Sequence, residues 1–560
     1  MHRRIRPIIL SFCILVTFLA YAQKRSITEK DLFQFNWIGD PQISPDGSRV
    51  AFVKVSVNDK KDGYDTSIWS VSIRGDEQPV RIGSGNHDSS PRWSPDGKWL
   101  AFIRTPDAPP PSAGAGSGSS SRPSGPQLHM LPTNGGESWK VTDLPRGVGG
   151  LVWSPDSKMI AFSSTTSPED LARQKSRKDS PDQKGGEGRE QASENKPEPE
   201  HESDVKVITH SVYRLNGGGY LDLKHPSHIW VMAAPRSSEE AVKPKQLTSG
   251  PFSERGILWA KDSSKIYFNT MRVHDPSYDL PHTDIYSVAA SGGDLQKVVS
   301  INLGIREETL SPDGKRLAFC ASVNEPVQSY TEPDLWVMDL AAGAQPRNLT
   351  TNYDFDVCSG LGGDQGTPRS GGGDEVLWTA DGNSLVVITA KEGKSNLVQF
   401  DVASGKPTEI TKGNQAVEHF RATNDGSKFV VLISTPMNIG DLFVVDRSGK
   451  QLAQITRIND KLFSQLNISA PEEIWYNSFD GKRIHAWIQK PPDFDSSKKY
   501  PLILDIHGGP HTAYGFIFDH EFQWMAAKGY VVLYPNPRGS TSYGQEFGNI
   551  IQYHYPGDDF

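Results

Sequence analysis

One stretch decides the interpretation of the C-terminal part of the chain, and it reads Tyr500-Pro501-Leu502-Ile503-Leu504-Asp505-Ile506-His507-Gly508-Gly509-Pro510-His511. Residues 502–506 form a short and mostly apolar run, which is typical of a parallel strand that is covered on both faces. Two glycines follow directly, so no Cβ screens their main-chain N–H groups. Such groups can face a developing negative charge, as in the oxyanion hole of an acyl-transfer enzyme. An isolated His-Gly-Gly is more often a plain turn, so the interpretation depends on the neighbouring residues.

The residues around this turn predict a parallel α/β unit. Residues 519–528 have helical composition and end before a glycine, which is common at helix ends. A second buried-strand run follows at residues 529–536, and strand, helix and strand in this order are typical of parallel α/β folds. Residues 471–492 predict a hairpin around an Asp-Gly turn in front of this unit.

At this point the chain resembles the prolyl oligopeptidase family of serine peptidases, in the acylaminoacyl-peptidase and dipeptidyl-aminopeptidase-like branch. The motifs that carry the resemblance are Lys499-Tyr500-Pro501, Asp505-Ile506-His507-Gly508-Gly509-Pro510, Asn536-Pro537-Arg538-Gly539-Ser540 and Tyr543-Gly544. The resemblance implies that residues 463–560 are the first part of an α/β-hydrolase domain. It further implies hydrolysis of oligopeptide substrates by acyl transfer, without a cofactor.

The resemblance assigns roles to residues of the glycine turn. Gly508 and Gly509, with His507, are the expected oxyanion-hole loop, and His507 is not expected to be the catalytic base because in this fold the base follows the nucleophile. Arg538 is expected to brace its loop. A substrate contact is the alternative for Arg538, since a guanidinium suits bidentate recognition of a carboxylate.

The nucleophile of this fold stands in Gly-x-Ser-x-Gly, followed by the acid and then the base. No Gly-x-Ser-x-Gly is present in the 560 residues, so the nucleophile, acid and base are not assigned to this chain, and we expect the polypeptide by itself to be inactive. Ser540 and Ser542 lack a neighbouring His-Asp pattern and are expected to pack in their loop. His, Cys and Asp show no metal-ligand spacing, so no metal site is predicted.

The N-terminus predicts a signal peptide of residues 1–22. Three arginines precede an apolar run at residues 8–19, and Ala20-Tyr21-Ala22 is a suitable cleavage site. The run is short for a membrane span, so we expect a secreted or periplasmic protein without stable membrane insertion after cleavage after Ala22. An uncleaved anchor is the alternative.

Charge and cysteine content narrow the function classes. Residues 1–22 hold three arginines and no acidic residue, so their removal takes the formal net charge from −8 to −11. Nucleic-acid binding needs a basic face, and nothing in the sequence indicates one. Cys13 leaves with this segment. A disulfide and two free thiols are equally compatible with the remaining Cys320 and Cys358.

Residues 43–456 contain a repeat that recurs about every fifty residues, with one interval about twice as long. Its clearest copies are the turns Ser44-Pro45-Asp46-Gly47, Ser94-Pro95-Asp96-Gly97, Ser154-Pro155-Asp156-Ser157 and Ser311-Pro312-Asp313-Gly314. Weaker copies lie at residues 260–263, 379–382 and 423–426. A tryptophan often stands three residues before the aspartate, and the fourth strand often ends in an apolar residue and a threonine. Four strands in each of seven repeats predict a seven-bladed β-propeller over residues 23–462.

Two further expectations concern the propeller. Residues 167–204, in the long interval, are charged and poor in apolar residues, so we expect a disordered or solvated insertion, with a second flexible loop at residues 106–125. The chain enters at a first strand and leaves after a fourth strand, so the ring should close by side-chain packing alone. The resemblance implies the same unlatched closure.

We therefore interpret the sequence as a signal peptide, a seven-bladed propeller and part of an α/β-hydrolase domain, which together form a serine peptidase whose propeller limits substrate access. A non-catalytic periplasmic propeller that acts as a binding or scaffold protein, with a vestigial hydrolase segment, is the alternative. Glu307-Glu308 and Glu239-Glu240 do not match the context of the paired glutamates in dipeptidyl-peptidase relatives, so removal of dipeptides is not favoured. The oligomeric state is not indicated.

Overall fold

The structure is a computed structural model that describes residues 24–107, 125–179, 205, 207–215, 219–273, 278–364, 366–369 and 375–557. The signal peptide predicted at residues 1–22 lies outside the described residues. So do most of the loop predicted at residues 106–125 and residues 180–204 of the predicted insertion.

A four-stranded antiparallel sheet recurs along the described part of the chain. The first two sheets contain β2 (Asn36–Ile43), β3 (Arg49–Val57), β4 (Tyr64–Ser72) and β5 (Val80–Arg81), then β6 (Asp88–Trp93), β7 (Trp99–Arg104), β8 (Gln127–Pro132) and β9 (Trp139–Lys140). The next contains β10 (Gly149–Trp153), β11 (Met159–Ser164), β14 (His228–Ala233) and β15 (Lys245–Gln246). Two more contain β16 (Glu254–Trp259), β17 (Lys265–Thr270), β18 (Thr283–Ala289) and β19 (Gln296–Ile301), then β20 (Arg306–Leu310), β21 (Arg316–Ala321), β22 (Asp334–Asp339) and β23 (Arg347–Asn348).

A nine-stranded sheet continues this series. It contains β24 (Asp356–Val357), β25 (Leu377–Trp378), β26 (Ser384–Lys391), β27 (Lys394–Asp401) and β28 (Pro407–Glu409), followed by β29 (Ala416–Ala422), β30 (Lys428–Thr435), β31 (Asn438–Asp446) and β32 (Gln451–Gln454). The two groups of strands are joined by one parallel pair, Ser395 with Ala416. The nine strands are thus two further antiparallel units placed side by side.

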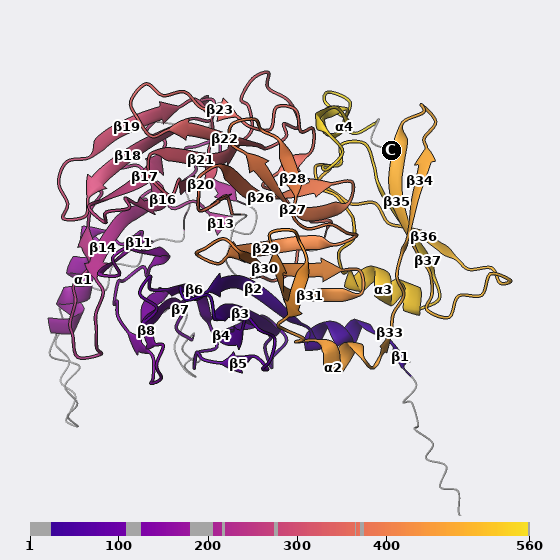
Figure 1. Ribbon diagram of the computed structural model, residues 1–560, viewed down its shortest axis with the longest axis horizontal. Coiled ribbons are helices and arrows are strands. Elements are labelled where there is room, and N and C mark those ends of the chain that lie inside the picture. Colours follow the sequence, from indigo (N-terminus) through magenta and orange to yellow (C-terminus); the bar gives the residue numbers. More distant parts are fainter. Residues whose placement is uncertain are drawn as a thin grey trace, which may run out of the picture.

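The sheets stand around a ring, as Figure 1 shows. The first strands follow one another, because β2 contacts β6, β6 contacts β10, β10 contacts β16, β16 contacts β20 and β20 contacts β25. The contact between β29 and β2 brings the last unit back to the first. This radial arrangement of four-stranded sheets is the propeller type of fold that the repeats predict.

The repeated sequence motifs have repeated hydrogen bonds. In the first turn the Ser44 hydroxyl donates to Asp46 at 2.5 Å and accepts from the Arg49 N–H at 3.0 Å, and the bond from Ser44 lowers the pKa of Asp46. Threonines at the end of a unit accept a backbone N–H from its third strand. These are Thr142 from Leu128, Thr248 from Ile229, Thr350 from Leu335, Thr411 from Leu397 and Thr456 from Leu442.

The repeated tryptophans join neighbouring sheets. Each donates its indole N–H to a backbone carbonyl in the first strand of the preceding sheet, so a buried polar group is satisfied where two sheets meet. The pairs are Trp93 with Gln42, Trp153 with Arg92, Trp259 with Val152 and Trp378 with Thr309, at 3.0, 3.0, 3.2 and 3.4 Å.

The expectation that packing alone closes the ring is wrong in one respect. No later strand completes the first sheet, and an apolar cluster does join the two ends, with Ile38, Val50, Phe52, Val71 and Ile73 against Val430, Leu432, Leu442, Val444 and Ile455. Polar bonds also cross the closure, however. The Asn459 amide accepts from the Asn36 N–H at 3.0 Å and donates to the Asn36 carbonyl at 2.8 Å. In addition, β1 (Arg25–Ser26) pairs in parallel with β33 (Leu466–Asn467).

The expectation of an unstructured insertion is wrong for its first residues. Helix α1 (Pro168–Asp179) begins the segment 167–204. The helix is anchored to the propeller because Asp170 pairs with Arg146 at 2.7 Å and Leu171 packs on the apolar cluster of the second and third sheets. Elsewhere in the long interval, β12 (Arg214–Leu215) and β13 (Gly219–Tyr220) form a small hairpin.

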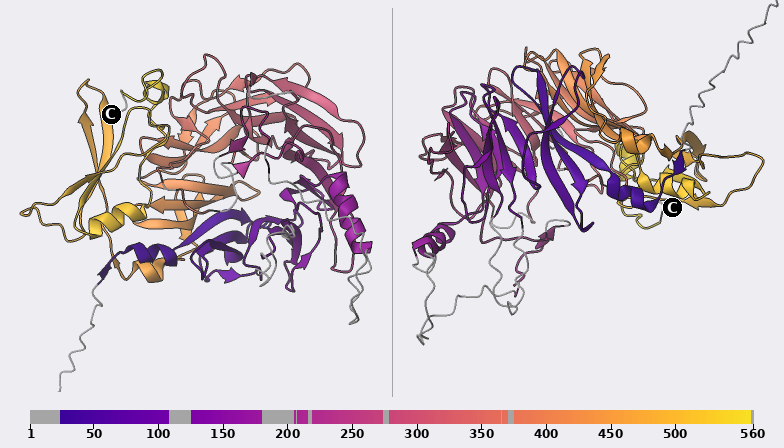
Figure 2. Two further views of the ribbon diagram at one scale, coloured as in Figure 1. Left: turned by 180° about the vertical axis from the view of Figure 1, so that it is seen from behind. Right: turned by 90° about the horizontal axis from the view of Figure 1, so that it is seen from below.

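The C-terminal part is a four-stranded sheet beside the ring. Its order is β34 (Glu472–Asn477), β35 (Arg483–Gln489), β37 (Val531–Asn536) and β36 (Leu502–Leu504), with α3 (His520–Ala527) between β36 and β37, and α4 (Gln545–Asn549) after β37. The pairing of β34 with β35 is antiparallel and that of β36 with β37 is parallel, as predicted. Figures 1 and 2 place this sheet next to β26–β31, near the short helices η1 (Glu29–Gln34) and α2 (Asp460–Phe463).

The prediction that the strand before the glycine turn is covered on both faces is wrong for the described residues. Leu502 and Leu504 keep 60% and 53% of their surface exposed, because they point to the same face of β36 and no described element packs on that face. The core of the sheet lies instead on the side of α3, where Trp487, Phe522, Val532 and Tyr534 are buried.

Candidate active site

His507 ties the glycine turn to the loop after β37. Its ring is buried, with Nδ1 3.0 Å from the Gly508 carbonyl and Nε2 3.0 Å from the Ser540 hydroxyl. The Ser540 hydroxyl also lies 2.6 Å from the Pro537 carbonyl. Burial lowers the pKa of His507 and favours the neutral ring. The Gly508 carbonyl can only accept, so this contact requires the tautomer with a proton on Nδ1. His507 therefore holds the turn, and Ser540 packs in its loop as predicted.

The two glycines differ in what their N–H groups do. The Gly508 N–H donates to the carboxylate of Asp364, at 2.7 Å. Among the residues that the structure describes, none accepts a hydrogen bond from the Gly509 N–H. Gly509 has a φ of +122°, a conformation that L side chains rarely adopt. The geometry therefore favours Gly509 over Gly508 as a donor to an oxyanion.

The carboxylate that holds Gly508 comes from the propeller. Asp364 lies in the segment between β24 and β25, and its second oxygen is 3.4 Å from the Tyr514 hydroxyl. That hydroxyl donates to Asp505 at 2.7 Å. Burial, with the bond to Asp505, raises the pKa of Tyr514, so the phenol remains protonated and able to donate. The turn is thus built from residues of both parts of the chain.

Arg538 connects its loop to the turn between β34 and β35. Its side chain is 4% exposed, pairs with Asp480 in the turn between β34 and β35, and lies over the Phe479 ring with its guanidinium carbon 5.0 Å from the ring centre. The bond from Arg538 lowers the pKa of Asp480. A guanidinium that is buried and paired in this way supports the bracing role and gives no support to the alternative of a substrate contact.

The loop after β37 is held by carboxylates of the propeller. The Ser542 N–H donates to Asp356 and the Gln545 N–H donates to Asp354, the latter at 2.9 Å. Glu332 lies near Asp356 and Asp354. Its burial, together with the negative charge of these two neighbours, raises the pKa of Glu332 to about 9. Ser542 therefore packs in its loop as predicted, against a group of acids that keeps a proton on Glu332 at neutral pH.

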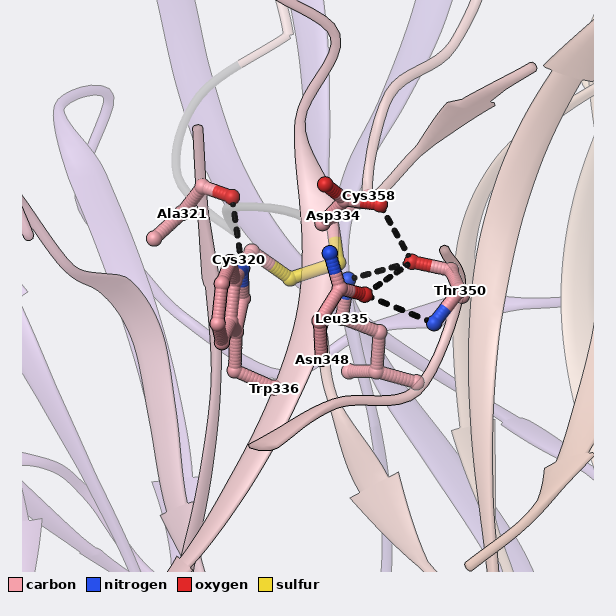
Figure 3. The surroundings of a disulfide bond; sticks show 8 residues. All are labelled: Cys320, Ala321, Asp334, Leu335, Trp336, Asn348, Thr350 and Cys358. Carbon is pink, nitrogen blue, oxygen red and sulfur yellow. Dashed lines mark hydrogen bonds between the residues drawn. A yellow bond between two sulfur atoms is a disulfide. The ribbon is translucent and has the colours of Figure 1, made fainter. Parts of the chain in front are cut away.

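Cys320 and Cys358 form a disulfide that joins two neighbouring sheets (Figure 3). Cys320 belongs to β21, and Cys358 directly follows β24. Thr350 lies close by, where its hydroxyl donates to Asp334 at 2.6 Å and accepts from the Leu335 N–H at 3.0 Å. Of the two alternatives that the sequence leaves open, the structure has the disulfide. It fixes the start of the segment that leads to Asp364.

Sequence reasoning missed Asp364 and the group of acids around Glu332. Asp364 stands among glycines in a segment without regular periodicity, so no sequence pattern marks it. Within the described residues, no group of three or more His, Cys, Asp or Glu side chains could hold a metal ion. No helix in the described ranges is long and apolar enough to cross a membrane.

Comparisons with known proteins relate this chain to peptidases. The family model described as "Prolyl oligopeptidase family" matches residues 516–560. The uncharacterized peptidase YuxL of Bacillus subtilis is 31% identical over 96% of this chain and 74% of its own length. Dipeptidyl-peptidase 5 of Porphyromonas gingivalis is 24% identical over 93% of this chain and 69% of its own. The acylaminoacyl peptidase of Pyrococcus horikoshii shares the fold with a TM-score of 0.67 at 20% identity, over 95% of this chain and 70% of its own.

A ring of four-stranded sheets next to an α/β sheet is the fold that this chain shares with the solved structure, and the relative and the family model add the class, which is that of peptidases with a propeller-like domain. The match to YuxL covers most of both chains at 31% identity, so the chain belongs to the prolyl oligopeptidase family of peptidases.

Proposed function

We propose that the protein is a serine peptidase that hydrolyses oligopeptides by acyl transfer, with the Gly509 N–H as a donor of its oxyanion hole. The observation that carries this proposal is the Gly508–Gly509 pair, in which the first N–H is engaged by Asp364 and the second has no acceptor among the described residues. Membership of a peptidase family supports the choice of a peptide carbonyl as the group that is attacked.

The mechanism divides the reaction into two steps. A serine oxygen attacks the peptide carbonyl and a base takes its proton, which places negative charge on the carbonyl oxygen. The Gly509 N–H stabilises that charge, the amine leaves with a proton, and water then releases the acyl group. Because Gly-x-Ser-x-Gly is absent from residues 1–560, we propose that the 560-residue polypeptide alone does not catalyse this reaction.

The proposed architecture counts the nine-stranded sheet as two blades, which makes a seven-bladed propeller over residues 23–462 followed by hydrolase residues 463–560. The contacts between successive first strands, and between β29 and β2, support this count. Carboxylates of the propeller contact the loops around the glycine turn, so the ring adjoins the site, and we propose that it limits which substrates enter. Residues 1–22 are proposed to be a cleaved signal peptide of a secreted or periplasmic protein.

The protein expressed from its complete reading frame provides the test. It should hydrolyse p-nitroanilides of short peptides and should leave a folded protein that contains the same peptide uncut, since the ring excludes large substrates. Pairs of substrates with free and acetylated N-termini measure whether a free amine is required. Hydrolysis of the folded protein at the rate of the free peptide would contradict the access role. Absence of any peptide hydrolysis would favour a binding or scaffold protein.

A further inference from the structure

We propose that Asp364 is a positioning residue of the active site, which orients the Gly508–Gly509 peptide from the propeller side. The inference rests on the proposed function, because it concerns how the oxyanion donor is held. The peptide unit that carries the Gly509 N–H begins at the Gly508 carbonyl, which lies 3.0 Å from His507 Nδ1. The N–H of Gly508 lies 2.7 Å from Asp364.

These two contacts act on either side of the Gly508 α-carbon. Gly508 has no side chain, so its backbone dihedral angles are otherwise free to vary widely. Holding both its N–H and its carbonyl restricts these angles and with them the direction of the Gly509 N–H. A donor that is fixed in advance stabilises the oxyanion without reorganisation during the reaction. Loss of the Asp364 bond should therefore weaken catalysis without removing the donor itself.

The segment that carries Asp364 is built to hold this position. Gly363, at a φ of +59°, donates its N–H to the Ala513 carbonyl at 3.1 Å, and Thr512 donates to the Gly363 carbonyl at 3.3 Å. A Cβ on Gly363 would lie 3.1 Å from the Tyr514 ring, so only glycine fits this approach without displacement. The segment therefore runs directly against the residues that follow the glycine turn.

Described residues before and after Asp364 are fixed in the propeller. The disulfide of Cys358 holds the beginning of the segment. After Asp364, Arg369 donates to the carbonyls of Ile38 and Ile439, at 2.7 and 2.8 Å, across the closure of the ring. Asp364 thus projects from a segment that is anchored on both sides, which is what a group that positions another requires.

Amide hydrogen exchange with residue-level fragmentation tests the contact without reference to activity, in the protein expressed from its complete reading frame. Asp364→Ala should speed exchange of the Gly508 amide about tenfold or more, because a bond to a charged acceptor is lost. Asp364→Asn keeps an oxygen acceptor and should stay within about threefold. Asp354→Ala is the matched control, since it removes a propeller carboxylate from the Gln545 N–H and should leave Gly508 unchanged. Unchanged exchange in Asp364→Ala would overturn the proposal.

Kinetics test the consequence for catalysis. Asp364→Ala should lower kcat about tenfold with KM nearly unchanged, and Asp364→Asn should restore most of it, because positioning acts on the transition state. Faster exchange with an unaltered kcat would show that Asp364 holds the turn without serving catalysis, which also overturns the proposal. A wild-type protein that hydrolyses no peptide would instead refute the proposed function, and the exchange experiment would still decide whether Asp364 holds the turn.

Discussion

Replacement of Gly509 by alanine is the substitution that the site geometry predicts most sharply. At the φ of +122° an added Cβ would lie 2.9 Å from the backbone nitrogen of His511, so the turn must move. Gly508 provides the control one residue away. It has no positive φ, and a Cβ there would meet only Asp364, at 3.5 Å, which is an ordinary contact.

The expected magnitude follows from strain and from the lost donor. A left-handed conformation costs an alanine about 1–2 kcal/mol, which the turn relieves by shifting. Loss of one oxyanion donor typically lowers kcat by about 10²–10³, or about 2.7–4 kcal/mol of transition-state stabilisation. Gly509→Ala should therefore lower kcat by about this factor with little change in KM. Gly508→Ala keeps its N–H on Asp364 and should keep kcat within about threefold.

The assay combines p-nitroanilide kinetics with thermal unfolding of both variants, in the protein expressed from its complete reading frame. Unchanged Tm values separate a catalytic effect from a loss of folded protein. If Gly509→Ala folds normally and keeps kcat within about threefold, far short of the loss expected for one donor, Gly509 is not an oxyanion donor. Equal losses in both alanine variants would refute the distinction drawn between the two glycines.

Three further predictions concern stability. Arg369→Met should destabilise the protein by about 3–5 kcal/mol, because it leaves the largely buried Glu418 without its partner, and adding Glu418→Gln should recover part of the loss in denaturant unfolding. Replacing both Cys320 and Cys358 by serine should cost about 2–4 kcal/mol, which unfolding in reducing and non-reducing buffer can check, since reduction should then no longer matter. The folded state keeps the proton of Glu332 up to about pH 9, whereas the unfolded chain releases it near the usual pKa of 4.5, so wild-type stability should fall as pH rises between these values. Glu332→Gln should make this slope shallower, because the contribution of Glu332 is lost, and an unchanged slope would contradict the raised pKa.

The propeller could be predicted from the sequence because its repeats are local. The turn around Asp46 needs only neighbouring residues, and its bonds from Ser44 and to Arg49 lie within one unit. The hairpin and the strand-helix-strand unit were predicted for the same reason. The exposure of Leu502 was not, because an apolar run has the same sequence whether or not another element covers that face of its strand.

The site was predictable only in part. The glycine turn is recognisable from its sequence and the family resemblance, whereas the contact of Asp364 with Gly508 joins residues that are 144 positions apart. Helix α1 was missed because its composition is polar and its anchor, the pair of Asp170 with Arg146, comes from another unit. Tertiary contacts of this kind override the preferences of local composition, and they produce no periodic pattern in the sequence from which they could be predicted.

The most direct test of serine-type acyl transfer is covalent labelling with a fluorophosphonate probe, followed by intact mass and peptide mapping. The protein expressed from its complete reading frame should take up one probe per chain, on a serine, and should lose peptide hydrolysis in proportion to labelling. The 560-residue polypeptide should take up none. Hydrolysis that survives complete labelling, or a labelled serine within residues 1–560, would contradict the account.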